Sequence, residues 1–366
     1  MLADDDSEVH EIVDPRDAAE GAGLVYVSDD SPGIAREKAE NGFTYRGPNG
    51  KTITNQKVLE RIRHLAIPPA YRDVWICPKA NGHIQATGRD DKGRKQYRYH
   101  AAFREVRESV KFEHMNAFAA ALPTIRSTVK THMALRGLPR EKVLATIVYL
   151  LETTLIRVGN ADYAKTNKSY GLTTLRDPHV EIEGSEIHFE FKGKSKKIWN
   201  LHVKDKRVAK IVGACQDLPG QQLFQYLDHE GLRHSVSSQD VNDYLHEITG
   251  RRITAKDFRT WAGTVLAALA LNGFEAFDSQ ALAKKNIRVA IENVSSRLGN
   301  TPSICRKCYV HPEILKTYLS GELLLEMKQE VDAELRDNLA QLSPEEAAVL
   351  AMLETRLGHD LEARDG

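Results

Sequence analysis

The segment PREKVLATIVYLLETTLIRVGN, residues 139–160, decides the fold class of the larger part of the chain. It begins at a proline, ends in Gly-Asn, and carries one apolar stripe at the spacing of an amphipathic helix. This spacing predicts a helix with one buried face, as expected in a mainly helical domain. The stripe is formed by Val143, Leu144, Ile147, Leu150, Leu151 and Leu155.

A small sheet is predicted shortly after this helix, in HVEIEGSEIHFEFKGKSKKIWNLHV, residues 179–203. Apolar residues alternate on both sides of a turn at Gly184, and they alternate again from Trp199 onward, after a second turn at KGKSKK. Alternation interrupted by short turns is typical of β-hairpins. The pattern predicts three antiparallel strands inside the helical domain.

The part of the chain before residue 101 reads as β-rich. FTYRGPNGKTI, residues 43–53, places a Gly-Pro-Asn-Gly turn between extended runs, and VWICP, GHIQATG and KQYRYH are further short strands. One helix is expected from about Asn55 to Leu65, with Thr54 as its N-cap. The period becomes helical around residues 101–111, which predicts an α+β chain with a β-rich domain over 23–105 and a mainly helical domain over 106–325.

The charge is distributed unevenly, although the formal net charge is zero. Residues 1–20 hold eight acidic side chains and one basic, and residues 321–366 hold twelve acidic and four basic. Residues 21–320 therefore keep 46 Lys and Arg against 31 Asp and Glu. A basic body suggests a polyanionic partner, and a solvated surface of mixed charge is the alternative.

The two acidic ends are expected to differ in structure. We expect residues 1–22 to form a disordered tail. Residues 326–366 are expected to form a helical tail, because SPEEAAVLAMLETRL supplies Ser343 as an N-cap and Pro344 at the first helical position. This helix either packs on the domain or competes with a polyanionic partner for the basic face of the chain.

Several classes of protein are disfavoured. No stretch approaches 18 uncharged apolar residues, and the acidic N-terminus lacks the apolar core of a signal peptide, so neither a membrane partner nor export is expected. The chain has only four cysteines, which favours free thiols in a reducing compartment and a cytoplasmic location. The GKS at residues 193–195 has His188 where a P-loop needs glycine, so no nucleotide site is predicted.

The segment NTPSICRKCYV, residues 300–310, contains a CxxC pair, Cys305 and Cys308. A structural zinc site needs four ligands, and no second pair accompanies this one. We therefore expect no metal and interpret the cysteines as packing residues. TPSICRKC is predicted to form a short helix with Thr301 as N-cap and Pro302 at its first position, which leaves Tyr309 at its end.

Five further residues lie in the order Arg157, Lys194, Arg259, Asn300 and Tyr309. Each alone has a structural explanation, such as an arginine near a helix end or a lysine in a solvated turn. Together, in their segments LIRVGN, FKGKSK, KDFRTWAGT, LGNTPS and the tyrosine segment, they resemble the poxvirus-like bacterial type IB DNA topoisomerases. GRDDKGRKQYRYH, residues 88–100, resembles the DNA-contacting segment of that family, and the resemblance covers roughly residues 25–320.

The resemblance implies a reaction and a role for each residue. Tyr309 would attack a DNA phosphodiester and form a 3′-phosphotyrosyl bond, with no cofactor, metal or ATP, in a monomer at the nucleoid. Arg157 and Arg259 would bind the phosphate oxygens, because guanidinium groups offer paired donors and stay ionised. Asn300, where many relatives have histidine, would donate to the same oxygens. Lys194 and Lys256, the latter on the helix of Arg259, would protonate the leaving 5′-oxygen.

The resemblance also implies duplex DNA as partner and names residues that would contact it. Tyr97 and Tyr99 alternate onto one face of a strand, and Gln can read an adenine edge while Arg or Lys reads guanine. Two other readings stay open. A tyrosine site-specific recombinase shares the Arg, Lys, Arg, Tyr chemistry, and a non-catalytic DNA-binding module would use the same basic body. The residues expected to contact DNA are Arg94, Lys95, Gln96, Tyr97, Tyr99 and Tyr163.

Overall fold

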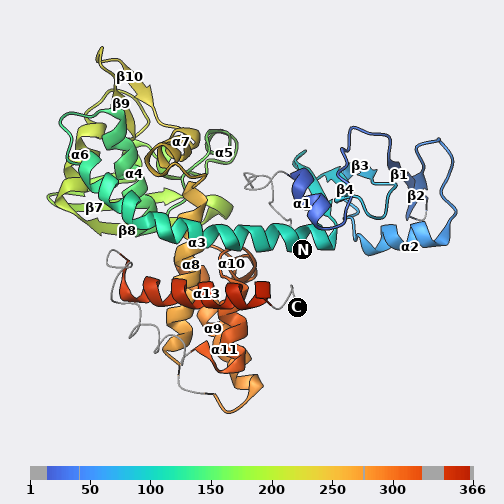
Figure 1. Ribbon diagram of the computed structural model, residues 1–366. Helices are drawn as coiled ribbons and strands as arrows, with labels where there is room; N and C mark the ends of the chain where they lie inside the picture. Colours follow the sequence, from blue (N-terminus) through green and yellow to red (C-terminus); the bar gives the residue numbers. More distant parts are fainter. Residues whose placement is uncertain (1–14, 41, 275–276, 324–341, 363–366) are drawn as a thin grey trace. The chain divides into compact units, whose positions relative to one another are not determined.

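The computed structural model describes residues 15–323 and 342–362, apart from residues 41, 275 and 276. The chain forms two compact units, Met1–His114 and Met115–Gly366 (Figure 1). Their division falls inside one continuous helix, α3 (Ala101–His132). The boundary expected near residue 105 also lies within this helix. Within the described ranges, no helix is long and apolar enough to cross a bilayer.

The first unit is built on one antiparallel sheet with the strand order β2-β1-β3-β4-β5. The expected strands around VWICP, GHIQATG and KQYRYH are confirmed as the last three of these. One amphipathic helix, α2 (Gln56–His64), covers the sheet. The strands are β1 (Ile34–Ala39), β2 (Gly42–Arg46), β3 (Arg72–Ile76), β4 (Ile84–Arg89) and β5 (Lys95–Tyr99).

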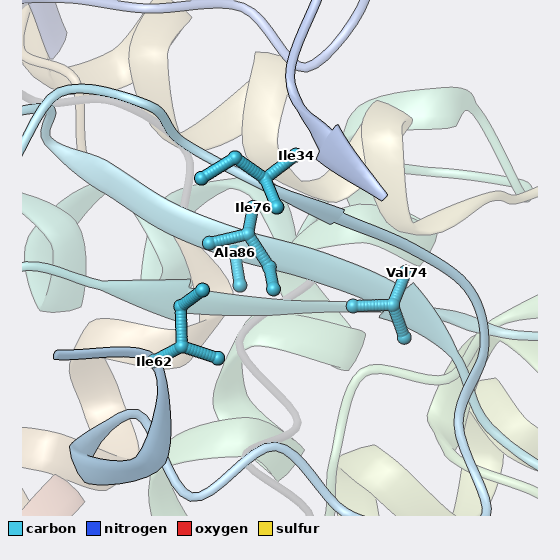
Figure 2. Close-up of a cluster of buried hydrophobic side chains, with 5 residues drawn as sticks. All are labelled: Ile34, Ile62, Val74, Ile76 and Ala86. Carbon is cyan, nitrogen blue, oxygen red and sulfur yellow. The ribbon is translucent and has the colours of Figure 1, made fainter. Parts of the chain in front are cut away.

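The core of this unit lies between α2 and the sheet. Figure 2 shows Ile62 of α2 together with apolar side chains from three strands, all almost fully buried. Burying such side chains stabilises the fold by roughly 1.5–3 kcal/mol each. The strand residues are Ile34, Val74, Ile76 and Ala86.

Two predictions for this unit were wrong in detail. The N-cap of α2 is Asn55, whose side chain accepts a hydrogen bond from the Val58 amide, and not Thr54. Both residue types cap well, so the sequence alone could not separate them. Residues 15–21, which we expected to be disordered, form the helix α1 (Pro15–Gly21), because Ala18 and Ala19 are buried against Phe103. Residues 1–14 lie outside the described ranges.

The second unit is mainly helical and holds a small sheet. Helices α4 (Arg140–Thr154) and α8 (Ala255–Asn272) pack against each other at its centre. The predicted three strands are confirmed, with antiparallel order β6-β7-β8 (Val180–Glu183, Glu186–Lys192 and Ile198–Lys204). The other elements are α5 (Ala161–Asn167), α6 (Lys206–Gln216), β9 (Gln225–Leu227), β10 (Arg233–Ser235), α7 (Ser238–Thr249), α9 (Gln280–Leu298), α10 (Pro302–Cys308), α11 (Pro312–Ser320) and α13 (Pro344–Glu362).

Helix α4 differs from its prediction in two ways. It is buried well beyond the predicted stripe, since Ala145 and Val148 are also fully enclosed, because α6, α7 and α8 all pack against it. It also ends at Thr154 and not at Gly-Asn, because Leu155 turns into the left-handed region with φ 58°. That conformation is uncommon for a branched apolar residue. Arg157 therefore lies on the segment after the helix and not in its last turn.

The C-terminal helix α13 packs on the second unit, and its predicted cap is confirmed, since the Ser343 hydroxyl accepts from the Glu346 amide. Figure 1 shows α13, in red, against α8, which it contacts. The Glu346 carboxylate accepts two hydrogen bonds from Arg126 and one from the Trp261 indole. Arg126 also pairs with Glu152 of α4 at 2.7 Å. Helix α13 thus joins α3, α4 and α8.

Deleting residues 343–366 is expected to lower the melting temperature rather than tighten DNA binding. Val349, Met352 and Leu353 of α13 are buried, and their loss should cost on the order of several kcal/mol. Thermal unfolding and DNA affinity of the truncated protein would be measured together, with Glu346→Gln as a milder variant. If the melting temperature were unchanged and the truncated protein relaxed DNA best at a higher salt concentration than the full chain, the result would instead support competition between the acidic tail and DNA.

Candidate active site

Tyr309 stands directly after the short helix α10, as the sequence predicts. Thr301 caps this helix, its hydroxyl accepting from the Ile304 amide, and Pro302 is its first residue. The Tyr309 amide donates to the Cys305 carbonyl at 2.9 Å, which fixes the tyrosine as the closing residue of the turn. Tyr309 is half-buried.

Arg259 projects from α8 and meets Tyr309. Its guanidinium carbon lies 5.2 Å from the centroid of the Tyr309 ring. The residue is only 3% exposed, and its two terminal nitrogens donate to the carbonyls of Leu155 and Leu298. Burial, together with the charge of Arg157, lowers the pKa of Arg259 to about 10, so it remains charged at neutral pH. These contacts fix the guanidinium before any substrate arrives.

Arg157 lies on the segment that follows α4. Its carbonyl accepts from the Leu172 amide at 2.9 Å, and the neighbouring Val158 carbonyl accepts from Thr173 at 2.7 Å. Gly171 allows these two backbone segments to approach each other closely, because a Cβ at this position would lie 2.5 Å from the Arg157 carbonyl oxygen. Sequence reasoning missed Gly171, since nothing local in SYGLTT indicates a backbone crossing.

Asn300 joins the same cluster from the end of α9. Gly299 closes that helix at φ 65°, and the Asn300 amide then donates to the Ser295 carbonyl at 2.9 Å. The Asn300 side-chain oxygen accepts a hydrogen bond from Arg157. Its amide nitrogen is buried and has no hydrogen-bond partner among the described residues. A donor left in this state is suited to an incoming acceptor oxygen.

The surrounding charges act on the Tyr309 hydroxyl. Burial alone would raise the pKa of this phenol, but the charges of Arg259, Arg157 and Lys256 and a hydrogen bond from Arg259 lower it below its ordinary value. Lys256 is exposed on the first turn of α8, near Arg259 as expected. A tyrosine in this setting is a better nucleophile than a free phenol.

Lys194 lies in the short turn between β7 and β8 and is exposed. This turn is attached to the end of α9 through Trp199. A Cβ at Gly193 would lie 2.6 Å from the Trp199 indole nitrogen, and one at Gly299 would lie 2.7 Å from the same ring. Lys197 adds a hydrogen bond from its ammonium to the Ser296 carbonyl at 2.9 Å. These contacts hold the turn of Lys194 at the end of α9, next to Asn300. The role of Trp199 in packing the turn against α9 was not predicted from the sequence.

The two cysteines of the tyrosine segment are free thiols in different settings. Cys305 is fully buried, and burial raises the pKa of its thiol to about 11. A thiol with such a pKa is protonated at neutral pH and is a poor nucleophile and metal ligand. Cys308 is partly exposed.

We predict that the double variant Cys305→Ser and Cys308→Ser retains most of its activity on DNA and that chelators do not inhibit the wild type. The reason is that burial keeps the Cys305 thiol protonated, and no second pair of ligands accompanies the two cysteines in the sequence. Relaxation of supercoiled plasmid with and without EDTA would measure this. Stoichiometric zinc in the purified wild type, lost together with activity in the double variant, would contradict it.

In the first unit, the strand β5 carries the predicted DNA-contacting residues. Tyr97 and Tyr99 stack on one face, with ring centroids 5.8 Å apart and nearly parallel planes. Lys95 forms an ion pair with Asp29 at 2.7 Å. A cavity of about 520 Å³ adjoins the two tyrosines and is rich in basic side chains. Its lining includes Arg61, His64, Arg98, His100 and Arg104.

Arg94 and Gln96 share one acidic partner. The carboxylate of Asp90 accepts from Arg94 at 2.8 Å and from the Gln96 amide at 3.2 Å. Gln96 is 9% exposed, so its amide can contact a base edge only after this arrangement changes. This intramolecular contact was not predicted from the sequence.

Tyr163 lies on α5 in the second unit and is half-buried. Asn160 caps that helix and accepts from the Tyr163 amide at 3.1 Å. Helix α5 therefore starts four residues after Arg157, on the segment that follows α4. The structure thus brings Arg157, Lys256, Arg259, Asn300 and Tyr309 into one cluster, with the turn of Lys194 attached to it.

Two family models match the chain in succession. Residues 42–90 match the N-terminal domain of bacterial DNA topoisomerase IB. Residues 100–337 match the catalytic core of eukaryotic DNA topoisomerase I, which is well over half of the chain. The second match contains every residue of the cluster around Tyr309, and it ends before α13.

The chain is also similar to viral proteins along most of its length. It is 32% identical over 306 residues to DNA topoisomerase 1B of Acanthamoeba polyphaga mimivirus, covering 81% of this chain and 91% of that protein. It is 26% identical over 285 residues to DNA topoisomerase 1B of Vaccinia virus (strain Copenhagen), covering 73% and 87%. With its five-residue cluster inside a matching catalytic core, the chain belongs to the type IB DNA topoisomerase family.

Proposed function

We propose that this type IB DNA topoisomerase relaxes supercoiled duplex DNA by transient cleavage of one strand through Tyr309, without ATP or a metal ion. The observation that carries the proposal is the Tyr309 phenol, whose pKa is lowered by the charges of Arg259, Arg157 and Lys256. A phenol needs such a positive environment to attack a phosphodiester at neutral pH. The polarity of the covalent bond, to a DNA 3′ phosphate, follows from the family resemblance.

Each step conserves atoms and charge. The Tyr309 phenol gives up its proton to solvent, and its oxygen forms a bond to phosphorus as the bond to the 5′-oxygen breaks. The 5′-oxygen takes up one proton and leaves as a hydroxyl. The reverse attack by the 5′-hydroxyl restores the strand and the free tyrosine. Because one phosphoester replaces another, the energy of the broken bond is retained and no nucleotide is consumed.

Arg157, Arg259 and Asn300 are proposed to bind the non-bridging oxygens of the phosphate. Arg259 uses two of its five N–H donors on the carbonyls of Leu155 and Leu298, which leaves donors for the phosphate. Asn300 contributes its buried amide nitrogen. Donors fixed in advance stabilise charge that develops in the transition state without reorganising.

Lys194 and Lys256 are proposed to supply the proton to the leaving 5′-oxygen. Both are exposed, and both belong to elements that hold the cluster, the β7–β8 turn and α8. An ammonium group can donate a proton to a departing oxygen, which is the task of a general acid.

Replacing Lys256 with methionine is expected to move the pH profile of DNA cleavage to higher pH. Lys256 is one of the charges that lower the pKa of Tyr309, so its removal raises the pKa of the nucleophile. Single-turnover cleavage rates across pH would show the shift, with the exposed Lys210→Met on α6 as a matched control. A pH profile identical to that of the wild type would show that the charge of Lys256 does not lower the pKa of Tyr309.

We propose that Arg94, Lys95, Gln96, Tyr97 and Tyr99 of the first unit, and Tyr163 of the second, contact duplex DNA. The paired tyrosine rings and the basic cavity beside them support this, since arginine and lysine bind phosphates and the rings add apolar contact. The domain division is proposed as a DNA-contacting unit over 23–105 and a catalytic unit over 106–325.

We further propose that the enzyme acts as a monomer on DNA in the bacterial cytoplasm. The cluster around Tyr309 draws all of its residues from one chain, so one copy contains a complete site. The match to a bacterial N-terminal domain supports a nucleoid substrate.

The direct test of this function is incubation with negatively supercoiled plasmid in EDTA and without ATP. A ladder of relaxed topoisomers is expected. Recombinant circles that depend on two copies of one DNA site would favour a tyrosine recombinase. DNA binding without any ladder would favour a non-catalytic module.

A further inference from the structure

Thr264 on α8 connects this helix to the backbone around Tyr309. Its hydroxyl donates to the Tyr309 carbonyl at 3.3 Å and accepts from the His311 amide at 3.0 Å. The residue is 0% exposed. Helical threonines elsewhere in this unit, such as Thr146 and Thr260, bond to a carbonyl of their own helix. The hydroxyl of Thr264 instead joins two separate elements.

Gly263, the preceding residue, brings the two elements into direct contact. A Cβ at this position would lie 2.4 Å from the Tyr309 carbonyl oxygen and 3.0 Å from the Tyr309 Cβ. Real Cβ atoms essentially never approach within 3.0 Å of another heavy atom. Any side chain at residue 263 would therefore displace the Tyr309 backbone from α8.

The same helix face carries the arginine that meets the tyrosine. Arg259 and Gly263 are four positions apart, which places them one above the other on an α-helix. Arg259 lies 5.2 Å from the Tyr309 ring, and Gly263 contacts the Tyr309 backbone. One face of α8 thus fixes both ends of the tyrosine, its ring and its main chain.

We propose that Gly263 and Thr264 are positioning residues that hold the Tyr309 backbone against α8, so that the hydroxyl of Tyr309 is aligned with the phosphate bound by Arg259. The inference rests on the proposed role of Tyr309 as nucleophile. Neither residue contacts the substrate. Their contribution is to the alignment of the attacking oxygen, and a displacement of about 1 Å can reduce such a rate roughly 100-fold.

Thr264→Val tests the hydroxyl with little change of volume. We expect the single-turnover rate of covalent adduct formation to fall roughly 10- to 100-fold. The Kd for duplex DNA should stay within about twofold of wild type, because no DNA contact is removed. Thr264→Ser, which keeps the hydroxyl, should restore most of the rate. The buried Thr146→Val on α4 is the matched control and should cleave at the wild-type rate.

Gly263→Ala tests the close approach independently. It leaves the hydroxyl of Thr264 in place but inserts a methyl group where the Tyr309 carbonyl lies. The rate should fall at least as far as in Thr264→Val. Because the phenol then moves relative to Arg259, the pH profile of cleavage should also shift to higher pH, an effect that a simple loss of stability would not produce. Melting temperatures would be recorded for every variant.

The outcomes separate this inference from the proposed function. If wild type forms an adduct through Tyr309 and Thr264→Val forms it at an unchanged rate, the positioning role is wrong. A slow Thr264→Val that serine does not rescue, with an unshifted pH profile in Gly263→Ala, also overturns it. If wild type forms no adduct through Tyr309, the proposed function itself fails.

Discussion

Tyr309→Phe is expected to abolish the covalent protein–DNA adduct while leaving DNA binding intact. Only the attacking oxygen is removed, and the ring that lies 5.2 Å from the Arg259 guanidinium is kept. Among the described residues, no other tyrosine contacts the cluster. Denaturing gels of end-labelled duplex would measure the adduct, and plasmid relaxation should fall to background.

The control for this variant is affinity for the same duplex, which should stay within about twofold of wild type. The melting temperature should change little, because a half-buried hydroxyl contributes at most about 1.5 kcal/mol through one hydrogen bond. An adduct that persists in Tyr309→Phe would assign the nucleophile to a different residue.

Arg259→Ala is expected to slow cleavage by about 10²–10³, or roughly 3–4 kcal/mol of transition-state stabilisation. The guanidinium is buried and held by the carbonyls of Leu155 and Leu298, so the group proposed to bind the phosphate is fixed in advance. Its charge also lowers the pKa of Tyr309. The variant loses both effects at once, and single-turnover cleavage at several pH values would measure them.

Loss of structure must be separated from loss of catalysis at this buried position. Arg259→Lys keeps a positive charge but cannot reach both carbonyls and the phosphate together, so its rate should fall between those of wild type and alanine. The exposed Arg251→Ala is a matched control for removal of an arginine from the same unit. If Arg259→Ala cleaved DNA at the wild-type rate while remaining folded, the phosphate-binding role would be excluded.

The elements that the sequence predicted correctly depend on local signals. The three-stranded sheet followed from alternation around Gly184 and the second turn, and both are observed. The helix before Tyr309 followed from Thr301 and Pro302, which act at its first turn. The N-cap of α13 was predicted in the same way, from Ser343 followed by a proline, and it is observed. Caps and hairpins are determined by a few neighbouring residues, so the sequence can indicate them, although at α2 two adjacent capping residues left the choice between Thr54 and Asn55 open.

The features that could not be predicted depend on residues far apart in the chain. Leu155 takes a left-handed conformation and ends α4 early, and its carbonyl accepts from Arg259 over a hundred residues later. Gly171 and Gly263 are required because another backbone segment passes close to each. Helix α1 forms because Phe103 covers two small alanines. None of these contacts can be recognised from the residues that neighbour each position in the sequence.

Part of the candidate site could be predicted from the sequence, and part of it required the structure. The residue types and their order led to the family by resemblance, and the family is now shown by the matches along the chain. The links of Arg157 to Asn300 and of Arg259 to Tyr309 needed the structure. The role of Thr264 could not be inferred from sequence, because a threonine in a buried helix ordinarily bonds to its own backbone.

The central claim is that Tyr309 forms the covalent bond to DNA, and peptide mapping of the trapped adduct tests it most directly. Wild-type protein would be denatured during cleavage of a duplex labelled on one strand, digested with a protease, and the DNA-linked peptide identified by mass spectrometry. The account predicts a peptide that contains Tyr309 linked to a 3′ phosphate, with a free 5′-hydroxyl on the other fragment. A DNA-linked peptide that lacks Tyr309, or a linkage to a 5′ phosphate, would contradict it.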